Sequence, residues 1–312
     1  MRAIVTGGAG FIGSHLVDRL LKDGHEVVCV DDLSTGSIEN VRRHVRNKRF
    51  TFRQTDIANG NIGSGDRIYN LACPASPKHY QADPTKTLRT CVAGAWNVLD
   101  LARRTGARAL QASTSEVYGD PEVHPQQEDY WGRVNSNGVR ACYDEGKRAA
   151  ETLFCDYKRQ YGTDIRIARV FNTYGPRMQM DDGRAVPAFI MQVLSGVPIT
   201  LHGGDQTRSF CYVDDTVEGM IALMESDETR PVNIGNPNEI TIRELVNRIR
   251  GLTGSECPVH LHKRPEDDPE RRCPDIRRAM SLGWEPKIAL DEGLRRTINY
   301  FAPKVDNSAT AA

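Results

Sequence analysis

The chain has 312 residues, with 41 basic and 41 acidic side chains, so its formal net charge is zero. A neutral chain with a pI near 7.1 argues against nucleic acid as the main partner. The length suits one large domain or two intimate ones. No apolar stretch approaches the roughly 18 residues of a membrane span, and no signal peptide is expected.

Eight cysteines are scattered singly along the chain, without a Cys-x-x-Cys pair. This usage predicts reduced thiols and a cytoplasmic protein. No cluster of histidine, cysteine and acidic residues has the spacing of metal ligands, so no metal is expected.

The first elements predict a dinucleotide site. Residues 2–6 form a short apolar run typical of a buried strand, and a glycine-rich turn leads into an amphipathic helix expected over 14–22. Gly7 permits the tight turn, Gly10 lets a pyrophosphate approach the backbone, and Gly13 lets helix and strand pack closely.

A second buried strand is expected over 26–30, and it ends in Asp31 and Asp32. An acid at this place, about 20 residues past the glycines, can accept hydrogen bonds from ribose hydroxyls. Because it would repel a 2′-phosphate, the sequence predicts NAD rather than NADP. Asp31 is the first choice for this contact, and Asp32 is the neighbour that can share it.

Strand and helix signals continue to alternate through the first half, which predicts an α/β fold with a doubly wound parallel sheet. The further elements expected there are strands over 67–72, 109–113 and 165–170, a two-proline loop over 73–77, and a long helix over 87–104.

Past Phe171 the glycines, prolines and polar loops predict a smaller lobe that binds the substrate. Helices are expected over 187–195, 215–225 and 242–252, and a strand over 232–234. The predicted division is a dinucleotide-binding domain over 1–173, to which 210–235 returns, a substrate lobe over 174–209 and 236–303, and a flexible tail over 304–312.

Tyr143 and Lys147 lie four residues apart, so a helix brings them to one face, one turn from each other. A lysine ammonium close to a phenol favours the phenolate and lowers the tyrosine pKa. The pair therefore predicts a proton acceptor that works near neutral pH, in combination with the dinucleotide site.

Five further motifs occur in order along the chain. They are Leu71-Ala-Cys-Pro-Ala-Ser-Pro77, Ser113-Thr-Ser-Glu-Val-Tyr-Gly119, Phe171-Asn-Thr-Tyr-Gly-Pro-Arg177, Gln206-Thr-Arg-Ser-Phe210 and Arg264-Pro-Glu-Asp-Asp-Pro-Glu-Arg-Arg272. Together with the glycine turn and Tyr-x-x-x-Lys, they make the chain resemble the extended short-chain dehydrogenase/reductases that act on nucleotide sugars. Within that superfamily it is most similar to the UDP-glucuronate decarboxylases, or UDP-xylose synthases. The resemblance extends to about residue 303 and implies a Rossmann-like fold, NAD and a lyase reaction.

By this resemblance, Thr114 supplies a hydroxyl that binds the sugar O4, and Tyr143 removes the O4 proton while hydride passes from C4 to NAD⁺. Lys147 also contacts the nicotinamide ribose. The resulting 4-keto uronic acid is a β-keto acid, which loses CO₂ as electrons flow into the ketone. Protonation at C5 and return of hydride to C4 then give UDP-xylose.

Ser115 and Glu116 discriminate between related reactions. The similar sugar 4,6-dehydratases carry Asp-Glu after the threonine, and an aspartate at 115 would repel the substrate's own carboxylate. A serine hydroxyl can instead donate a hydrogen bond. Epimerases lack the acid at 116, so Glu116 is expected to act as a general acid/base or to orient water near C5.

The resemblance also implies further contacts. It places NAD at Gly7, Gly10, Phe11, Ile12, Gly13, Asp31, Asp32, Asp56, Ile57, Leu71, Ala72, Tyr143 and Lys147. It places the nucleotide sugar at Pro77, Tyr80, Glu116, Asn172, Arg177, Arg184, His202, Arg208, Arg271 and Arg272. Of Arg271 and Arg272, Arg271 is slightly preferred as the residue that contacts the diphosphate.

The chain departs from the family pattern at three points. The loop 201–206 is one residue shorter than usual, His202 stands where a tyrosine is common, and Cys91 replaces an asparagine often found near the cofactor. These changes leave open the nucleotide preference and whether some 4-keto sugar is released.

Three alternatives to decarboxylation are considered: a nucleotide-sugar 4,6-dehydratase, a UDP-glucuronate 4-epimerase, and a scaffold that keeps NAD without catalysis. Ser115 argues against the first and Glu116 against the second. The complete set of Thr114, Tyr143 and Lys147 argues against the third. The resemblance also implies a homodimer formed through a four-helix bundle.

Overall fold

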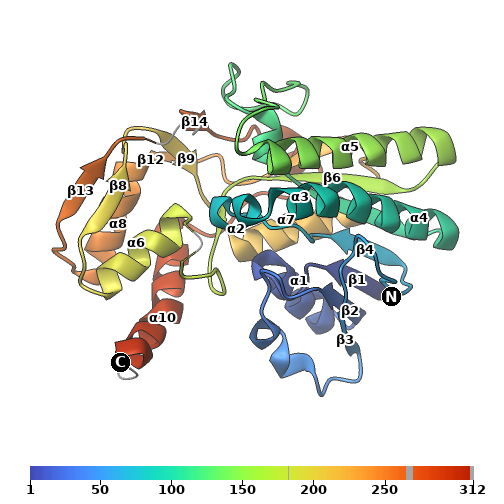
Figure 1. Cartoon of the computed structure of the whole chain (residues 1–312), viewed down its shortest axis with the longest axis horizontal. Helices are drawn as coiled ribbons and strands as arrows, with labels where there is room; N and C mark the ends of the chain where they lie inside the picture. The colour runs from blue at the N-terminus through green and yellow to red at the C-terminus, as the bar shows by residue number, and fades with distance from the viewer. Residues whose placement is uncertain (182, 265–269, 310–312) are drawn as a thin grey trace.

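The computed structural model describes residues 1–181, 183–264 and 270–309 (Figure 1). Its centre is a seven-stranded parallel sheet in the order β11-β6-β5-β4-β1-β2-β3. These strands are β1 (Arg2–Thr6), β2 (Glu26–Asp31), β3 (Phe50–Gln54), β4 (Arg67–Asn70), β5 (Arg108–Thr114), β6 (Ile165–Val170) and β11 (Pro231–Ile234). The predicted doubly wound α/β fold is thereby confirmed.

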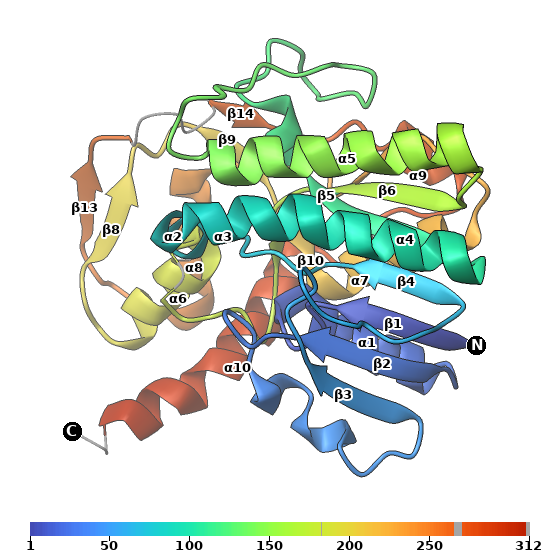
Figure 2. The ribbon, with the colours of Figure 1, turned by 45° about the vertical axis from the view of Figure 1, so that its right-hand side comes forward.

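Helices cover both faces of this sheet (Figure 2). One face carries α1 (Phe11–Lys22) and α7 (Val213–Glu225), and the other carries α4 (Ala95–Thr105) and α5 (Ala141–Tyr161). Side chains alternate along β1 because successive residues of a strand point to opposite faces. Ala3 and Val5 pack with α1, whereas Ile4 packs with α4 and α5.

The long helix predicted over 87–104 consists of three consecutive segments. They are α3 (Pro84–Arg89), a π-helical turn (Thr90–Gly94) and α4, preceded by the short α2 (Pro77–Ala82). A π turn inserts one residue into the helical ladder and is frequent near functional sites. Shorter 3₁₀ turns are Ile38–Asn40, Arg42–His44 and Ser115–Tyr118.

The second lobe has its own apolar core, built by α6 (Ala185–Leu194), α8 (Ile242–Thr253) and α10 (Leu290–Ala309). Its strands form small sheets: β8 (Ile199–His202) with β13 (Val259–His262), and β9 (Thr207–Ser209) between β12 (Glu239–Thr241) and β14 (Arg271–Arg272). A parallel pair of β7 (Thr173–Tyr174) and β10 (Cys211–Tyr212) lies where the chain passes between the lobes. Within the described ranges, no helix is long and apolar enough to cross a membrane.

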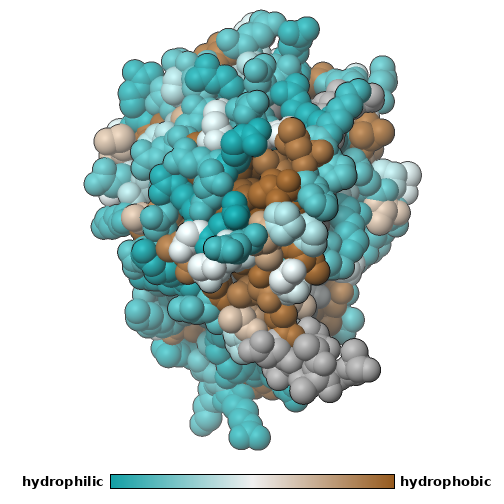
Figure 3. All heavy atoms as spheres, turned by 90° about the vertical axis from the view of Figure 1, so that its left-hand side faces the viewer, coloured by the Kyte–Doolittle hydropathy of each residue, from teal (hydrophilic) through white to brown (hydrophobic). Residues whose placement is uncertain are grey.

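The outer face of this lobe is mostly hydrophilic but carries an apolar strip (Figure 3). All four residues of β13 are exposed, and Leu261 keeps 63% of its surface accessible. Among the described strands β13 pairs only with β8, so its outer edge is open.

The packing differs from the predicted division at two places. Ile276 and Trp284, assigned to the substrate lobe, pack in the core beside α1 and α7, where α9 (Arg277–Ser281) contacts β11. Trp284 also donates its indole N–H to the carbonyl of Asp215 at 3.0 Å.

Helix α10 continues through Pro303 to residue 309, so the segment predicted as a flexible tail is helical as far as that residue. Residues 310–312, and residues 265–269 of the 264–272 motif, lie outside the described ranges.

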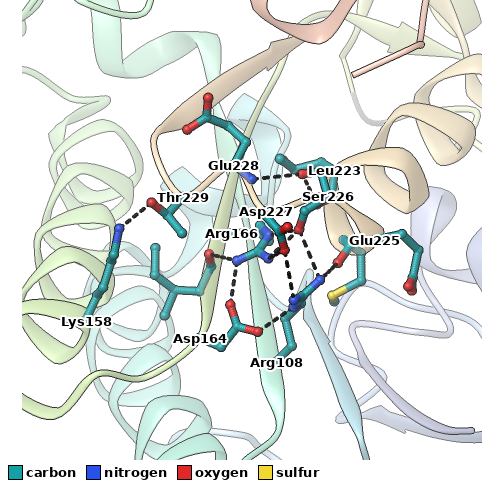
Figure 4. Close-up of polar contacts among 12 residues, drawn as sticks. Arg108, Lys158, Asp164, Arg166, Leu223, Glu225, Ser226, Asp227, Glu228 and Thr229 are labelled. Carbon is teal, nitrogen blue, oxygen red and sulfur yellow. Dashed lines mark hydrogen bonds and ion pairs between the residues drawn. The ribbon is translucent and has the colours of Figure 1, made fainter. Parts of the chain in front are cut away.

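Two arginines fix the C-terminal end of α7 against the sheet (Figure 4). Arg166 of β6 is 1% exposed and donates from Nε to the Ser226 carbonyl at 2.9 Å, and from Nη1 to Asp164 at 2.6 Å. Arg108 of β5 donates to the carbonyls of Met224 and Ser226 at 2.8 and 3.0 Å. The last carbonyls of a helix lack partners within the helix, and these guanidinium groups supply them.

We expect Arg166→Leu to lower the free energy of unfolding by about 1–3 kcal/mol, because it removes the hydrogen bonds of a buried guanidinium to the Ser226 carbonyl and to Asp164, for which only Arg108 then remains as a donor among these two arginines. The matched control is Arg159→Leu, whose arginine is exposed on α5 and pairs with Asp156. Urea unfolding should place this control within about 0.5 kcal/mol of the parent. Equal losses in the two variants would show that the buried contacts of Arg166 contribute nothing.

Candidate active site

A cavity of about 1490 Å³ lies where the loops after the parallel strands meet the second lobe. Ligands of doubly wound sheets bind at this carboxyl edge of the strands. Every residue predicted to act in catalysis or to bind the cofactor lines this cavity. So does every predicted sugar-binding residue except Arg271, whose side chain is 55% exposed.

The glycine turn forms a close-fitting cradle at one end of the cavity. Gly7 has φ +66°, and a Cβ there would lie 2.8 Å from the carbonyl carbon of Leu71. A Cβ on Gly13 would lie 2.1 Å from the carbonyl oxygen of Gly7. Helix α1 begins after Gly10 with no side-chain cap and no acidic residue in its first turn. Its N–H groups are thus available to an anion such as a pyrophosphate, which fits the predicted cofactor.

Asp31 closes the end of β2 beside this cradle. Its carboxylate accepts hydrogen bonds from the backbone N–H groups of Ala9 and Leu33, both at 2.9 Å. Burial nevertheless raises the pKa of Asp31 above its ordinary value. The neighbouring Asp32 instead pairs with Lys86 at 2.8 Å, and it is half-buried. Both carboxylates line the cavity, so both stay candidates for ribose hydroxyls.

Tyr143 and Lys147 lie on the face of α5 that packs against β5. Lys147 is 4% exposed and donates to the carbonyl of Ala112 at 2.8 Å. Its Nζ lies 5.8 Å from the centre of the Tyr143 ring. The Tyr143 hydroxyl is hydrogen-bonded to the side chain of Thr114. The strand end and the helix thus bring the three predicted catalytic groups together.

The expected lowering of the tyrosine pKa is wrong for this state of the site. Burial raises the pKa of Tyr143 well above 10, and the charges of nearby thiols act in the same direction. Of the main contributions to this pKa, only the hydrogen bond with Thr114 lowers it. The lysine does not compensate for the desolvation of the phenolate, which is the larger effect at a buried position.

In the cavity wall, three buried polar atoms have no hydrogen-bond partner among the described residues. They are Tyr80 Oη, Asn172 Nδ2 and Arg177 Nη1. The Tyr80 ring stacks on that of Tyr143, with centroids 5.1 Å apart and planes inclined by 6°. Buried polar groups are normally satisfied, so these atoms mark places where a polar ligand can supply the missing partner.

Glu116 lies between two arginines from separate parts of the chain. Arg140, which precedes α5, donates to its Oε2 at 2.5 Å, and Arg272 of β14 lies 2.7 Å from Oε1. Arg208 of β9 is the neighbour of Arg272 in its sheet and adds a third positive charge. These charges hold the pKa of Glu116 below its ordinary value despite its burial. Glu116 is therefore an ionised proton acceptor here.

Arg140 was missed by the sequence interpretation. It lies three residues before Tyr143, one helical turn away, and this spacing is the available signal. An arginine at the start of a helix is usually solvated, so the sequence alone gives no reason to single it out. Arg272, rather than the slightly preferred Arg271, is the member of its pair in the cavity wall.

The far end of the cavity belongs to the second lobe. Pro77, Arg184 and His202 line it. Arg184 lies over the ring of Phe11 at 5.6 Å, and the His202 ring lies 5.3 Å from that of His262 on the adjacent strand. Within the described residues, no group of three or more histidine, cysteine or acidic side chains is placed to hold a metal ion.

The fold and this site define an NAD-dependent enzyme of sugar-nucleotide type, and comparison with known proteins identifies the family. The model of the NAD dependent epimerase/dehydratase family matches residues 3–235, and the chain belongs to this family.

Among curated proteins, the chain is 52% identical to UDP-glucuronic acid decarboxylase 1 of Xenopus tropicalis, over 99% of this chain and 74% of that protein. It is 54% identical to UDP-glucuronic acid decarboxylase 6 of Arabidopsis thaliana, over 94% and 87% of the two chains. Among solved structures it is similar to the UDP-glucose 4-epimerase of Thermotoga maritima with UDP-glucose (TM-score 0.90, 29% identity, 98% and 100% covered). It is also similar to the UDP-glucuronic acid 4-epimerase of Bacillus cereus in complex with UDP-glucuronic acid and NAD (TM-score 0.89, 28% identity, 97% and 100% covered).

Asp144 follows Tyr143 and yields a prediction about pH. Burial and the charge of Glu116 raise its pKa to about 7 from an ordinary 3.8. Between these values the folded protein binds a proton that the unfolded chain releases, so the stability due to this proton is lost as pH rises towards 7. We expect the parent to lose about 1–3 kcal/mol relative to Asp144→Asn, which imitates the protonated carboxyl, between roughly pH 5 and 8.

Urea unfolding of both proteins at several pH values measures this difference. Asp156→Asn, an exposed carboxyl on the same helix, is the control and should show no such trend. A difference between parent and Asp144→Asn that is independent of pH would contradict the assignment.

Proposed function

We propose that this protein is an NAD-dependent UDP-glucuronate decarboxylase that forms UDP-xylose through a UDP-4-keto-pentose. The observation that carries the proposal is the neighbourhood of Thr114, Tyr143 and Lys147: a neutral Ser115 and the Glu116–Arg140–Arg272 cluster adjoin them. The decarboxylase names of relatives at 52% and 54% identity support it.

The residues of the glycine cradle would hold NAD, with the pyrophosphate at the start of α1 and Asp31 or Asp32 at the adenosine ribose. When bound, NAD accepts a hydride from the sugar and later returns it. Asp56, Ile57, Leu71 and Ala72 line the same end of the cavity and complete this proposed contact set.

Tyr143 removes the proton of the sugar O4, and Thr114 holds both the tyrosine hydroxyl and that oxygen. Because burial opposes the phenolate, Tyr143 becomes an effective base only when a positive charge enters the cavity. A cationic cofactor provides such a charge, in addition to Lys147. Oxidation of the sugar is then coupled to the presence of cofactor.

Oxidation at C4 makes the substrate a β-keto acid. The bond between C5 and the carboxylate carbon breaks, CO₂ leaves, and the electron pair passes into the ketone as an enolate. Thr114 and Tyr143 donate hydrogen bonds to the developing charge on O4. Glu116 is ionised, so it can accept a hydrogen bond from a water molecule near C5 and orient it, and this water can deliver the proton that C5 gains after CO₂ has left.

The substrate diphosphate is negatively charged and requires cations. Arg208 and Arg272 are each 6% exposed, lie side by side in their sheet and line the cavity. We propose that these two arginines hold the diphosphate, because a planar guanidinium suits phosphate oxygens, with Asn172 as a further contact. His202 and Arg184 are proposed to lie near the uracil.

A direct assay tests this function. Purified protein incubated with UDP-glucuronate and NAD should release CO₂ and give a product with the mass of a UDP-pentose, without accumulating NADH. Release of CO₂ with persisting NADH would show escape of the keto sugar. A product of unchanged mass would mean epimerisation, and the proposal would fail.

Within the same assay, Tyr143→Phe should lower kcat by about 10³-fold or more, since it removes the general base but keeps the ring that stacks on Tyr80. Binding of NAD, followed by fluorescence titration, should change by less than about three-fold. Tyr161→Phe, at an exposed tyrosine of the same helix, serves as the control. Near-normal turnover by Tyr143→Phe would exclude it as the base.

Ser115→Asp should raise KM for UDP-glucuronate about ten-fold or more, because a repulsion of 1.4 kcal/mol between two carboxylates already gives that factor. Ser115→Ala removes the hydroxyl without adding charge and should have the smaller effect. Steady-state kinetics of both variants, with circular dichroism to verify folding, decide the point. An unchanged KM for Ser115→Asp would place the substrate carboxylate elsewhere.

We also propose a homodimer formed through the helices α4 and α5 in the cytoplasm. Support comes from exposed apolar side chains on these helices and on the preceding α3, namely Leu88 of α3, Trp96 of α4 and Tyr161 of α5, with exposures of 43%, 50% and 41%. Sedimentation analysis of the parent should give twice the chain mass, and Trp96→Glu should shift it towards the monomer. A monomeric parent would contradict the assembly.

A further inference from the structure

Cys73 and Cys91 lie against each other beside the cavity, and the proposed reaction uses neither of them. Their sulfur atoms are 3.2 Å apart. Cys73 follows Leu71 and Ala72 and lines the cavity itself. Cys91 is 3% exposed and belongs to the π-helical turn between α3 and α4, next to the cavity residue Thr90.

The surroundings of the two thiols differ. Cys91 packs against Gly146, where a Cβ would lie 3.1 Å from its sulfur, one residue before Lys147. The thiol of Cys73 as a donor and the charge of Lys147 both lower the pKa of Cys91, whereas burial raises the pKa of Cys73. The third nearby thiol, Cys142, donates to the Tyr80 carbonyl at 3.5 Å. Cys91 is thus the more acidic thiol of the pair, and Cys73 is its hydrogen-bond donor.

We propose that Cys73 and Cys91 are a redox modification site: a peroxide that enters the cavity joins them in a reversible disulfide, which slows the reaction. The activity part of this proposal rests on the proposed function, whereas the disulfide itself does not.

The chemistry balances with hydrogen peroxide as the oxidant. The Cys91 thiolate attacks one peroxide oxygen, the O–O bond breaks, and the released hydroxide takes a proton to become water. The sulfur of Cys73 then attacks the sulfenic acid of Cys91, the S–S bond forms, and the S–O bond breaks. The leaving hydroxide takes the proton of Cys73. Two thiols and one peroxide give one disulfide and two waters.

The disulfide changes the cavity because the two sulfurs must approach from 3.2 Å to about 2.05 Å. Cys91 is held within a helical segment that packs on α5, whereas Cys73 belongs to a loop after β4, which moves more easily. The displacement therefore falls on the 71–74 segment that lines the proposed cofactor site. A shift of about 1 Å in such a wall can cost up to 10²-fold in rate.

The test uses the reduced full-length protein treated with hydrogen peroxide. We expect peptide mass spectrometry without reductant to find the peptides of Cys73 and Cys91 joined. The rate of CO₂ release should fall about ten-fold or more, and dithiothreitol should restore it. Cys91→Ala, compared with its own untreated sample, should lose less than about two-fold, with Cys91→Asn as a second variant if the alanine variant folds poorly. Cys257→Ala, at a thiol in the other lobe, should respond like the parent.

Three results would overturn the proposal. They are the absence of a 73–91 linkage, a linkage that leaves the rate unchanged, and equal inhibition of Cys91→Ala. If the protein shows no decarboxylation at all, the proposed function fails, but the mapped linkage and a fluorescence titration of NAD before and after oxidation still decide this inference.

Discussion

The buried carboxylate of Glu116 is the constraint on which the site depends. A carboxylate out of water costs several kcal/mol unless charges and hydrogen bonds compensate it. Here the compensation comes from Arg140 before α5 and from Arg272 in the second lobe. Because neither arginine belongs to β5 or to the 3₁₀ turn that carries Glu116, the carboxylate is satisfied only when α5 and the lobe are both docked against the sheet. The ion pairs that join these parts therefore also form part of the polar wall of the cavity.

Burial has the opposite consequence for Tyr143. The Lys147 ammonium, 5.8 Å from the centre of its ring, does not cancel its desolvation, so its pKa is raised. A base that is weak by itself and strong beside a positive cofactor does not need to hold a phenolate in the empty site. Together with the ionised Glu116, this arrangement separates the two proton-transfer tasks of the proposed reaction. Tyr143 becomes a base only beside a positive cofactor, whereas Glu116 is ionised before the cofactor binds.

The sequence predicted those parts of the site whose chemistry is local. The glycine turn, the acid after the second strand and the Tyr-x-x-x-Lys pair can each be recognised from residues a few positions apart in the sequence, and all of them line the cavity. What it could not predict depends on contacts between distant segments. Arg140 contributes to the site through its ion pair with Glu116, and the contact of Cys73 with Cys91 requires the loop after β4 to meet the π turn. Trp284 returns to the first core through a hydrogen bond to the distant Asp215. The raised pKa of Tyr143 was missed because a pair spacing carries no information on burial.

The outcome of the proposed reaction is decided by few residues. The oxidising set of Thr114, Tyr143 and Lys147 can serve any chemistry that begins with a ketone at C4, and the solved epimerases share this chain's fold at 28% and 29% identity. A β-keto acid loses CO₂ readily once formed. An enzyme therefore needs only to bind the substrate without placing a negative charge against its carboxylate. A neutral side chain at 115 meets that requirement, while the arginines around Glu116 keep the local charge balanced. In the proposed reaction, selectivity therefore lies in the charge of residues 115 and 116 and their neighbours, and the set of Thr114, Tyr143 and Lys147 beside them can stay unchanged.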